Sequence, residues 1–172
     1  MAKFSKILVA NRSEIAVRVI KSIKNKGLQS VAIFAEGDEN SNHVNLADEA
    51  LCVGPSEVSE SYLNIKNILN AAKSTGADAI HPGYGFLSEN DDFSRECEAA
   101  GICFIGPSPE IIKLMGNKAE AKRKMIEIGV PCIPGYQNQE QLDKPLIEAA
   151  KEIGFPIMIK AAAGGGGRGM RL

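Results

Sequence analysis

Short apolar runs alternate with amphipathic helical segments over the first hundred residues of the chain. Apolar runs typical of strands occur at 7–10, 30–35, 50–53, 77–81 and 102–105. Segments with helical periodicity separate them at 14–26, 64–74 and 90–100. Repeated β-α-β units with short connections predict an α/β fold built on a parallel, doubly wound sheet, with helices on both faces. Ligands of such a sheet bind beyond the carboxyl ends of its strands.

The pattern changes after Gly106-Pro107. Helical segments at 110–115 and 118–128 follow each other with no strand between them, and a further helix is expected at 142–153. An apolar run at 155–159 then indicates a short buried strand. We therefore expect an N-terminal α/β domain at 1–106, linking helices at 107–134, and the truncated beginning of a second domain at 135–172.

A lysine and a run of glycines follow that last apolar segment. Lys160 is separated by three alanines from four consecutive glycines, and Arg168-Gly169 come next. Backbone N–H groups of glycine can approach an anion closely, so the pattern favours a phosphate-binding flap between two strands. The segment is not a Walker A loop, because Met170 occupies the place of its lysine. A plain flexible linker is the alternative interpretation.

Composition excludes several function classes. The 20 basic and 21 acidic residues give a net charge of −1 without a basic stripe, so nucleic acid is not an expected partner. No apolar run approaches the ~20 residues of a membrane span. The four cysteines have no C-x-x-C spacing, which favours reduced thiols and a cytoplasmic setting.

Four motifs resemble those of one family, in the same order and along the whole chain. They are N-R-S-E-I-A at 11–16, H-P-G-Y-G-F-L-S-E-N at 81–90, L-M-G-N-K at 114–118, and the lysine–glycine segment at 160–171. These segments are similar to those of biotin carboxylases, enzymes with the ATP-grasp fold. The resemblance implies a Rossmann-like pre-ATP-grasp domain followed by the start of an ATP-grasp domain.

The resemblance also implies an activity. Biotin carboxylases use ATP and bicarbonate to carboxylate the biotin of a carrier protein, the first half-reaction of acyl-CoA and pyruvate carboxylases. The implied cofactors are ATP, biotin and Mg²⁺, and the implied partners are a biotin carboxyl carrier protein or domain and a carboxyltransferase subunit. A homodimer is expected for the complete enzyme, with a place in fatty acid metabolism.

Site residues are assigned by position in these motifs. Lys118, Lys160, Gly166 and Gly167 match ATP-contacting positions, and a lysine ammonium suits phosphate. Three further residues match the biotin side of the family's active site: Tyr84, Gly85 and Phe86. A tight loop that needs its glycines and packs its aromatic side chains is the alternative interpretation of this segment. No residue here is assigned a catalytic role. The metal ligands are expected outside the chain, so we expect these 172 residues alone to be inactive.

Two other positions have structural interpretations, and two more are given no chemical role. His81, at a strand end, is expected to fix the following loop through a backbone hydrogen bond rather than to act in proton transfer. Ser13 replaces a glycine of the family motif, so the position is expected either to be strained by a positive φ or to cap the next helix. Arg12 and Glu14 are given no chemical role.

Two other function classes remain open. Another ATP-grasp ligase, of the kind that makes carbamoyl phosphate or purine intermediates, would share the lysine and glycines but is not expected to contain the ten-residue motif at 81–90. A non-catalytic scaffold domain is the second alternative, and it is favoured if the natural chain ends at Leu172.

Overall fold

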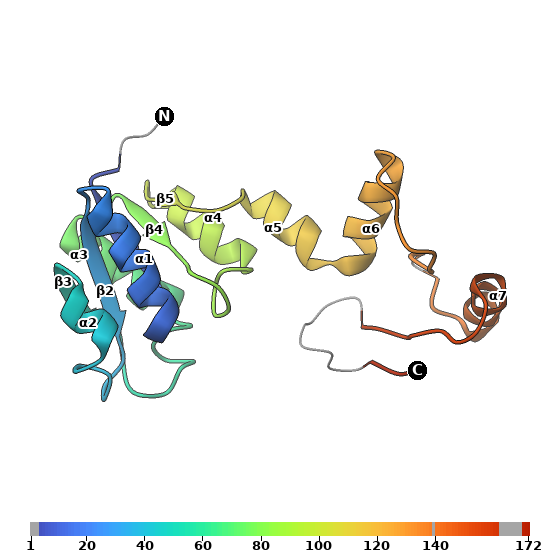
Figure 1. Ribbon diagram of the computed structural model, residues 1–172, viewed down its shortest axis with the longest axis horizontal. Helices are drawn as coiled ribbons and strands as arrows, with labels where there is room; N and C mark the ends of the chain where they lie inside the picture. Colours follow the sequence, from blue (N-terminus) through green and yellow to red (C-terminus); the bar gives the residue numbers. More distant parts are fainter. Residues whose placement is uncertain (1–3, 139, 162–169) are drawn as a thin grey trace. The chain divides into compact units, whose positions relative to one another are not determined.

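The fold has two compact units, Met1–Ile112 and Lys113–Leu172 (Figure 1). The computed structural model describes residues 4–138, 140–161 and 170–172. Within these residues, no helix combines the length and apolar character needed to cross a membrane.

A single parallel sheet organises the first unit. Its spatial order is β3-β2-β1-β4-β5, and every neighbouring pair is parallel. The strands are β1 (Lys6–Val9), β2 (Gln29–Phe34), β3 (Glu49–Cys52), β4 (Ala79–His81) and β5 (Cys103–Phe104). The sequence prediction of a doubly wound parallel sheet is therefore confirmed.

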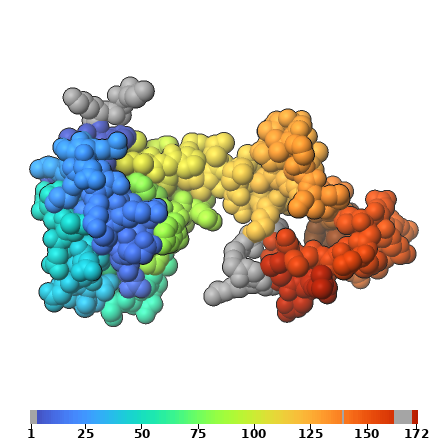
Figure 2. All heavy atoms as spheres, viewed as in Figure 1, coloured from blue at the N-terminus to red at the C-terminus, as the bar shows by residue number. Residues whose placement is uncertain are grey.

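Helices cover both faces of this sheet because its strands are apolar on both sides. The helices of the first unit are α1 (Ser13–Asn25), α2 (Asn42–Leu46), α3 (Ile65–Thr75) and α4 (Asp91–Ala99). Alternate residues of β1 point to opposite faces. Leu8 packs with α3 and α4, whereas Ile7 and Val9 pack with α1. This unit, whose atoms are coloured blue to yellow in Figure 2, therefore contains two apolar clusters, one on each face of the sheet.

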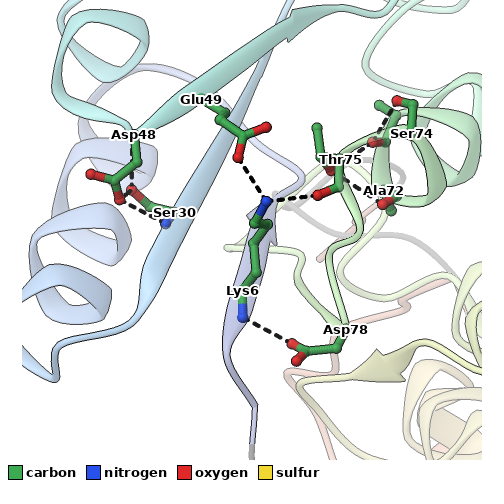
Figure 3. Close-up of polar contacts among 9 residues, drawn as sticks. Lys6, Ser30, Asp48, Glu49, Ala72, Ser74, Thr75 and Asp78 are labelled. Atoms are coloured by element: carbon green, nitrogen blue, oxygen red, sulfur yellow. Dashed lines mark hydrogen bonds and ion pairs between the residues drawn. The ribbon is translucent and has the colours of Figure 1, made fainter.

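Polar contacts hold the amino ends of the strands together (Figure 3). Lys6 Nζ lies 2.7 Å from a Glu49 carboxylate oxygen and donates to the Thr75 carbonyl at 2.7 Å. Asp78 accepts from the Lys6 backbone N–H at 3.1 Å. Asp48 accepts from the Ser30 hydroxyl at 2.7 Å. These contacts join β1, β2, β3 and the segment before β4, and they lie at the end of the sheet opposite to where a ligand would bind.

The second unit has helices but no buried residue among those the structure describes. α5 (Pro109–Gly116) leads from the first unit, and α6 (Lys118–Glu127) and α7 (Asp143–Ile153) follow. Asn117 caps α6 by accepting from the Ala119 and Glu120 N–H groups at 3.1 and 3.2 Å.

The expected buried strand at 155–159 is wrong. The Phe155 side chain is 74% exposed, and the only pairing of this segment within the described residues is an antiparallel bridge between Ile159 and Arg171. A single bridge buries no side chain, because burial of a strand requires neighbouring strands and helices. The bridge, with N···O distances of 2.8 and 3.0 Å, does pair the segments on either side of the predicted flap in antiparallel fashion. The glycine flap between these segments, 162–169, lies outside the described residues.

Candidate functional site

The candidate site lies where the carboxyl ends of β1 and β4 meet. These two strands are neighbours in the sheet, and the strand order continues in opposite directions from them. β2 and β3 lie beyond β1, and β5 lies beyond β4. This is the topological switch point, where doubly wound sheets bind ligands. β1 is followed by Asn11 and Arg12, and β4 is followed by the loop 82–88, which contains the candidate residues Tyr84, Gly85 and Phe86.

Asn11 connects the ends of the two strands. Its side chain is buried, with 4% of the residue exposed. The amide Nδ2 donates to the carbonyls of Pro82 at 2.8 Å and Tyr84 at 2.9 Å, and Oδ1 accepts from the Arg12 N–H at 2.9 Å. Asn11 thus donates hydrogen bonds to two backbone carbonyls of a loop that lies about seventy positions further along the chain.

The loop itself fits closely around this asparagine. Gly83 has φ +69°, and a Cβ there would lie 2.7 Å from Asn11 Nδ2, so the position requires glycine for two independent reasons. The next side chain, Tyr84, is 57% exposed and donates its hydroxyl hydrogen bond to the Glu14 carboxylate. That hydrogen bond raises the pKa of the Tyr84 hydroxyl. Glu14, given no role from sequence, therefore orients the exposed tyrosine.

Phe86 is held from the other side by an aromatic and charged cluster. Its ring stacks on Tyr62 at a centroid distance of 5.4 Å and an interplanar angle of 9°. The Arg12 guanidinium carbon lies 5.3 Å from the Tyr62 centroid and 5.9 Å from that of Phe86, which is cation–π geometry. The Tyr62 hydroxyl donates to Asp38 at 2.6 Å and accepts from the Ala35 N–H at 3.1 Å. Burial, together with the Asp38 hydrogen bond, raises the pKa of Tyr62.

The backbone hydrogen bond predicted for His81 is confirmed. Its Nδ1 accepts from the Gly83 N–H at 3.0 Å, which ties the end of β4 to the turn that follows it. Burial lowers the pKa of His81, and the charge of Arg18 lowers it further. Both effects favour the neutral imidazole, and because Nδ1 accepts from Gly83, the neutral ring carries its proton on Nε2.

Ser13 has the positive φ expected of the family's glycine position. Its φ is +59°, in the left-handed region, and it is the first residue of α1. The alternative prediction, that Ser13 caps the helix, is wrong: Arg12 is the N-cap residue, and no side chain makes a capping hydrogen bond there. A serine at this φ strains the turn that leads from β1 into α1.

The residues matched to ATP lie in the second unit. Lys118 is the exposed first residue of α6, and Lys160 is exposed beside the bridge residue Ile159, rather than at the end of a buried strand as expected. Gly166 and Gly167 lie outside the described residues. Among the residues described, no three His, Cys, Asp or Glu side chains gather in a group that could hold a metal ion.

Sequence reasoning gave no role to Arg12 and Glu14, and it missed three further residues of the site: Asn11, Asp38 and Tyr62. Asn11 had a usable signal, because a polar residue directly after a buried strand lies at the ligand-binding edge of a parallel sheet. Asp38 and Tyr62 had none, since each acts through a contact with residues at least 24 positions away.

Comparison with known proteins identifies this arrangement. Residues 3–112 match the family model "Biotin carboxylase, N-terminal domain", and residues 117–172 match "Carbamoyl-phosphate synthase L chain, ATP binding domain". The chain is 52% identical to the biotin carboxylase of Nostoc sp. over 99% of its own length and 38% of that protein. It is 53% identical to the mitochondrial methylcrotonoyl-CoA carboxylase subunit alpha of Dictyostelium discoideum, over 98% of this chain and 24% of that protein.

Solved structures give the same result. Biotin carboxylase from Campylobacter jejuni, solved as a β,γ-ATP complex, matches with a TM-score of 0.94 and 47% identity over 98% of this chain and 38% of that one. The biotin carboxylase domain of Hydrogenobacter thermophilus 2-oxoglutarate carboxylase, solved as a dimer with MgADP, ADP and bicarbonate, matches at a TM-score of 0.92 and 49% identity over 99% and 38%. The chain thus spans well under half the length of these relatives. On its motifs, its sheet and these matches, the chain belongs to the biotin carboxylase family, with that family's N-terminal domain followed by the start of an ATP-binding domain.

Proposed function

We propose that this chain is the N-terminal part of an enzyme that carboxylates biotin with ATP and bicarbonate. The observation that carries the proposal is about 50% identity to biotin carboxylases over nearly the whole chain. The reaction would be the first half of an acyl-CoA or pyruvate carboxylase cycle. ATP, with Mg²⁺, would supply the phosphoryl group that activates bicarbonate.

The loop after β4 is proposed to face the biotin side of the active site. Tyr84 offers an exposed aromatic ring there, and Gly85 and Phe86 continue the loop. The loop lies at the switch point of the sheet, the position at which this fold class binds ligands. Its anchoring by Asn11 and Tyr62 supports a binding role, because binding loops act best on a rigid scaffold.

Lys118 and Lys160 are proposed to contact the phosphates of ATP, with Gly166 and Gly167 of the flap closing over them. Both lysines are exposed residues in the described structure, and the ammonium group of a lysine suits a phosphate. In this assignment residues 1–106 form the N-terminal domain, 107–134 the linking helices and 135–172 the start of the ATP-grasp lid domain.

Partners and location follow from the same proposal. A biotin carboxyl carrier protein or domain would deliver biotin, and a carboxyltransferase subunit would use the carboxybiotin. The dimeric biotin carboxylase domain of the 2-oxoglutarate carboxylase supports a homodimer for the complete enzyme. The cytoplasm is the proposed location.

Kinetics of the longer protein with Lys160→Gln test the nucleotide assignment. A charge-assisted phosphate contact is worth ~1.5–3 kcal/mol, so kcat/KM for ATP should fall by roughly 10- to 150-fold. Lys118→Gln should act in the same direction. Lys144→Gln, an exposed lysine in the first turn of α7, is the matched control and should be near neutral. The assignment is wrong if the loss falls on the KM for free biotin instead, or if the control loses as much.

ATP cleavage by the purified chain, compared with that of the longer protein, distinguishes the enzyme from its alternatives. We expect the 172 residues alone to show no biotin- and bicarbonate-dependent ATP cleavage, because they span 38% of the biotin carboxylases they match. The longer protein should show it. A carbamoyl-phosphate-type ligase shares the ATP-binding domain model, but the match of residues 3–112 to the biotin carboxylase domain favours the first proposal. ATP cleavage that depends on ammonia rather than biotin would reverse that preference.

A further inference from the structure

We propose that Asn11 is a positioning residue, which holds the loop 82–88 in the one conformation that presents Tyr84 to the ligand. The inference rests on the proposed biotin-side role of that loop. It assigns to Asn11 an effect on the biotin site through hydrogen bonds to the loop backbone rather than through contact with biotin.

Both the donor and the acceptor groups of the Asn11 side chain make hydrogen bonds. Both N–H groups of its amide are directed at loop carbonyls, those of Pro82 and Tyr84, and the amide oxygen holds the start of α1 through the Arg12 N–H. An aspartate would keep the acceptor and lose both donors. A serine is too short to reach two carbonyls and a backbone N–H together. Because Asn11 is buried, water cannot replace the lost donors without a rearrangement.

The loop needs such support because its backbone is strained at one residue. Phe86, which is not a glycine, has φ +41°, whereas Gly83 and Gly85 adopt φ +69° and +65° without strain. Left-handed backbone at a bulky residue is unfavourable and persists only where the surroundings determine it. A loop released from its contacts would therefore relax to other conformations.

Two contacts impose the conformation from opposite sides. Asn11 holds the first half of the loop by its carbonyls, and the Tyr62 ring holds the second half by stacking on Phe86. Tyr62 is in turn fixed by hydrogen bonds to Asp38 and Ala35. Tyr84 lies between these two points of support, so the position of its ring depends on both.

The test uses the longer protein, with free biotin and ATP varied separately. Asn11→Ser should raise the KM for biotin by roughly 10- to 100-fold, because small misplacements of a positioning group have effects of this size. The KM for ATP should stay within about twofold, since the hydrogen bonds of Asn11 are to residues of the first unit and the proposed ATP residues belong to the second. Asn70→Ser, at an exposed position on α3, is the matched control and should leave both constants unchanged.

A second variant covers the case in which Asn11→Ser does not fold. Tyr62→Phe keeps the ring that stacks on Phe86 and removes only the hydroxyl, so the sheet should remain intact. It should raise the biotin KM in the same direction, by several-fold. Hydrogen exchange should report faster exchange of the amides at 83–88 in both variants, with the amides of β1 and β2 unchanged.

The outcomes separate this inference from the proposed function. A parent protein with no biotin-dependent ATP cleavage contradicts the proposed function itself. An active parent, in which folded variants loosen 83–88 but keep the biotin KM, overturns the positioning role alone. Equal losses for biotin and ATP would also overturn it, because they indicate general destabilisation.

Discussion

The two units have similar helical patterns and very different burial. α1 and α7 are both amphipathic helices of comparable length. α1 buries five residues against the sheet: Ile15, Ala16, Val19, Ile20 and Ile23. α7 buries none, and its Ile147 is 54% exposed. The comparison teaches that periodicity specifies a helix and its apolar face, whereas burial of that face depends on a partner element.

The largest expected effect comes from a core substitution in the first unit, compared with the same substitution at an exposed position in the second. Ile80, on β4, is fully buried, so Ile80→Ala should lower the free energy of unfolding by about 2–5 kcal/mol. Ile147→Ala should change it by less than about 0.5 kcal/mol. Urea unfolding of the purified chain measures both. Similar losses in the two variants would mean that α7 has a buried face, and the contrast would fail.

The next effect is a pH dependence confined to the first unit, which contains both histidines, His43 and His81. Burial lowers the pKa of each, although the Ile33 carbonyl beside His43 Nε2 opposes the shift. The folded pKa values therefore lie below the unfolded value of about 6.5, and the unfolded state binds more protons as pH falls through that value. The free energy of unfolding of the first unit should therefore be at its full value above about pH 7 and should decrease as the pH falls toward 5.

Unfolding curves at a series of pH values, with His43→Gln as the comparison variant, check this sign. In the variant the free energy of unfolding should depend less steeply on pH, because one of the two titrating groups is removed. Amide protection in α6 and α7, corrected for the pH dependence of the intrinsic exchange rate, should not decrease in parallel with the stability of the first unit. Increasing stability on acidification between pH 7 and 5 would contradict the account.

Replacing Ser13 by glycine should raise the free energy of unfolding, in contrast to the core substitution, and by a smaller amount. A glycine adopts the φ of +59° at this position without strain, so Ser13→Gly should raise the stability of the first unit by about 0.5–1 kcal/mol. Thermal unfolding measures the gain. Ser22→Gly, within the same helix, is the matched control and should be destabilising. A loss of stability in Ser13→Gly would show that the serine side chain contributes more than its strain.

The smallest expected change is at the surface. Arg95 pairs with Asp91 at 3.4 Å and Glu110 at 3.2 Å, and half of its side chain is exposed. Arg95→Ala should therefore cost less than about 1 kcal/mol, and the difference from the parent should shrink at high salt. Thermal unfolding at two salt concentrations tests this. A cost like that of Ile80→Ala would show that surface charge, rather than the core, determines stability in this unit.

Sequence could predict the elements of the first unit because their signals are local. The alternation of strands and helices, and caps such as Asn90, which accepts from the Phe93 N–H at 2.7 Å, arise from neighbouring residues. The predicted buried strand at 155–159 failed because burial is a tertiary property. The contacts of Asn11 with the loop and of Tyr62 with Phe86 were not predictable for the same reason: each joins segments brought together only by the sheet.

Hydrogen exchange of the 172-residue chain tests the central contrast most directly. The account predicts strong protection of the amides in β1, β2 and β4, whose neighbours on both faces are buried, and weak protection throughout α6 and α7. The amide of Ala35, which donates to the buried Tyr62 hydroxyl, should be protected with the first group. Protection of α7 equal to that of β1 would contradict the account, because it would require a buried core in the second unit as well.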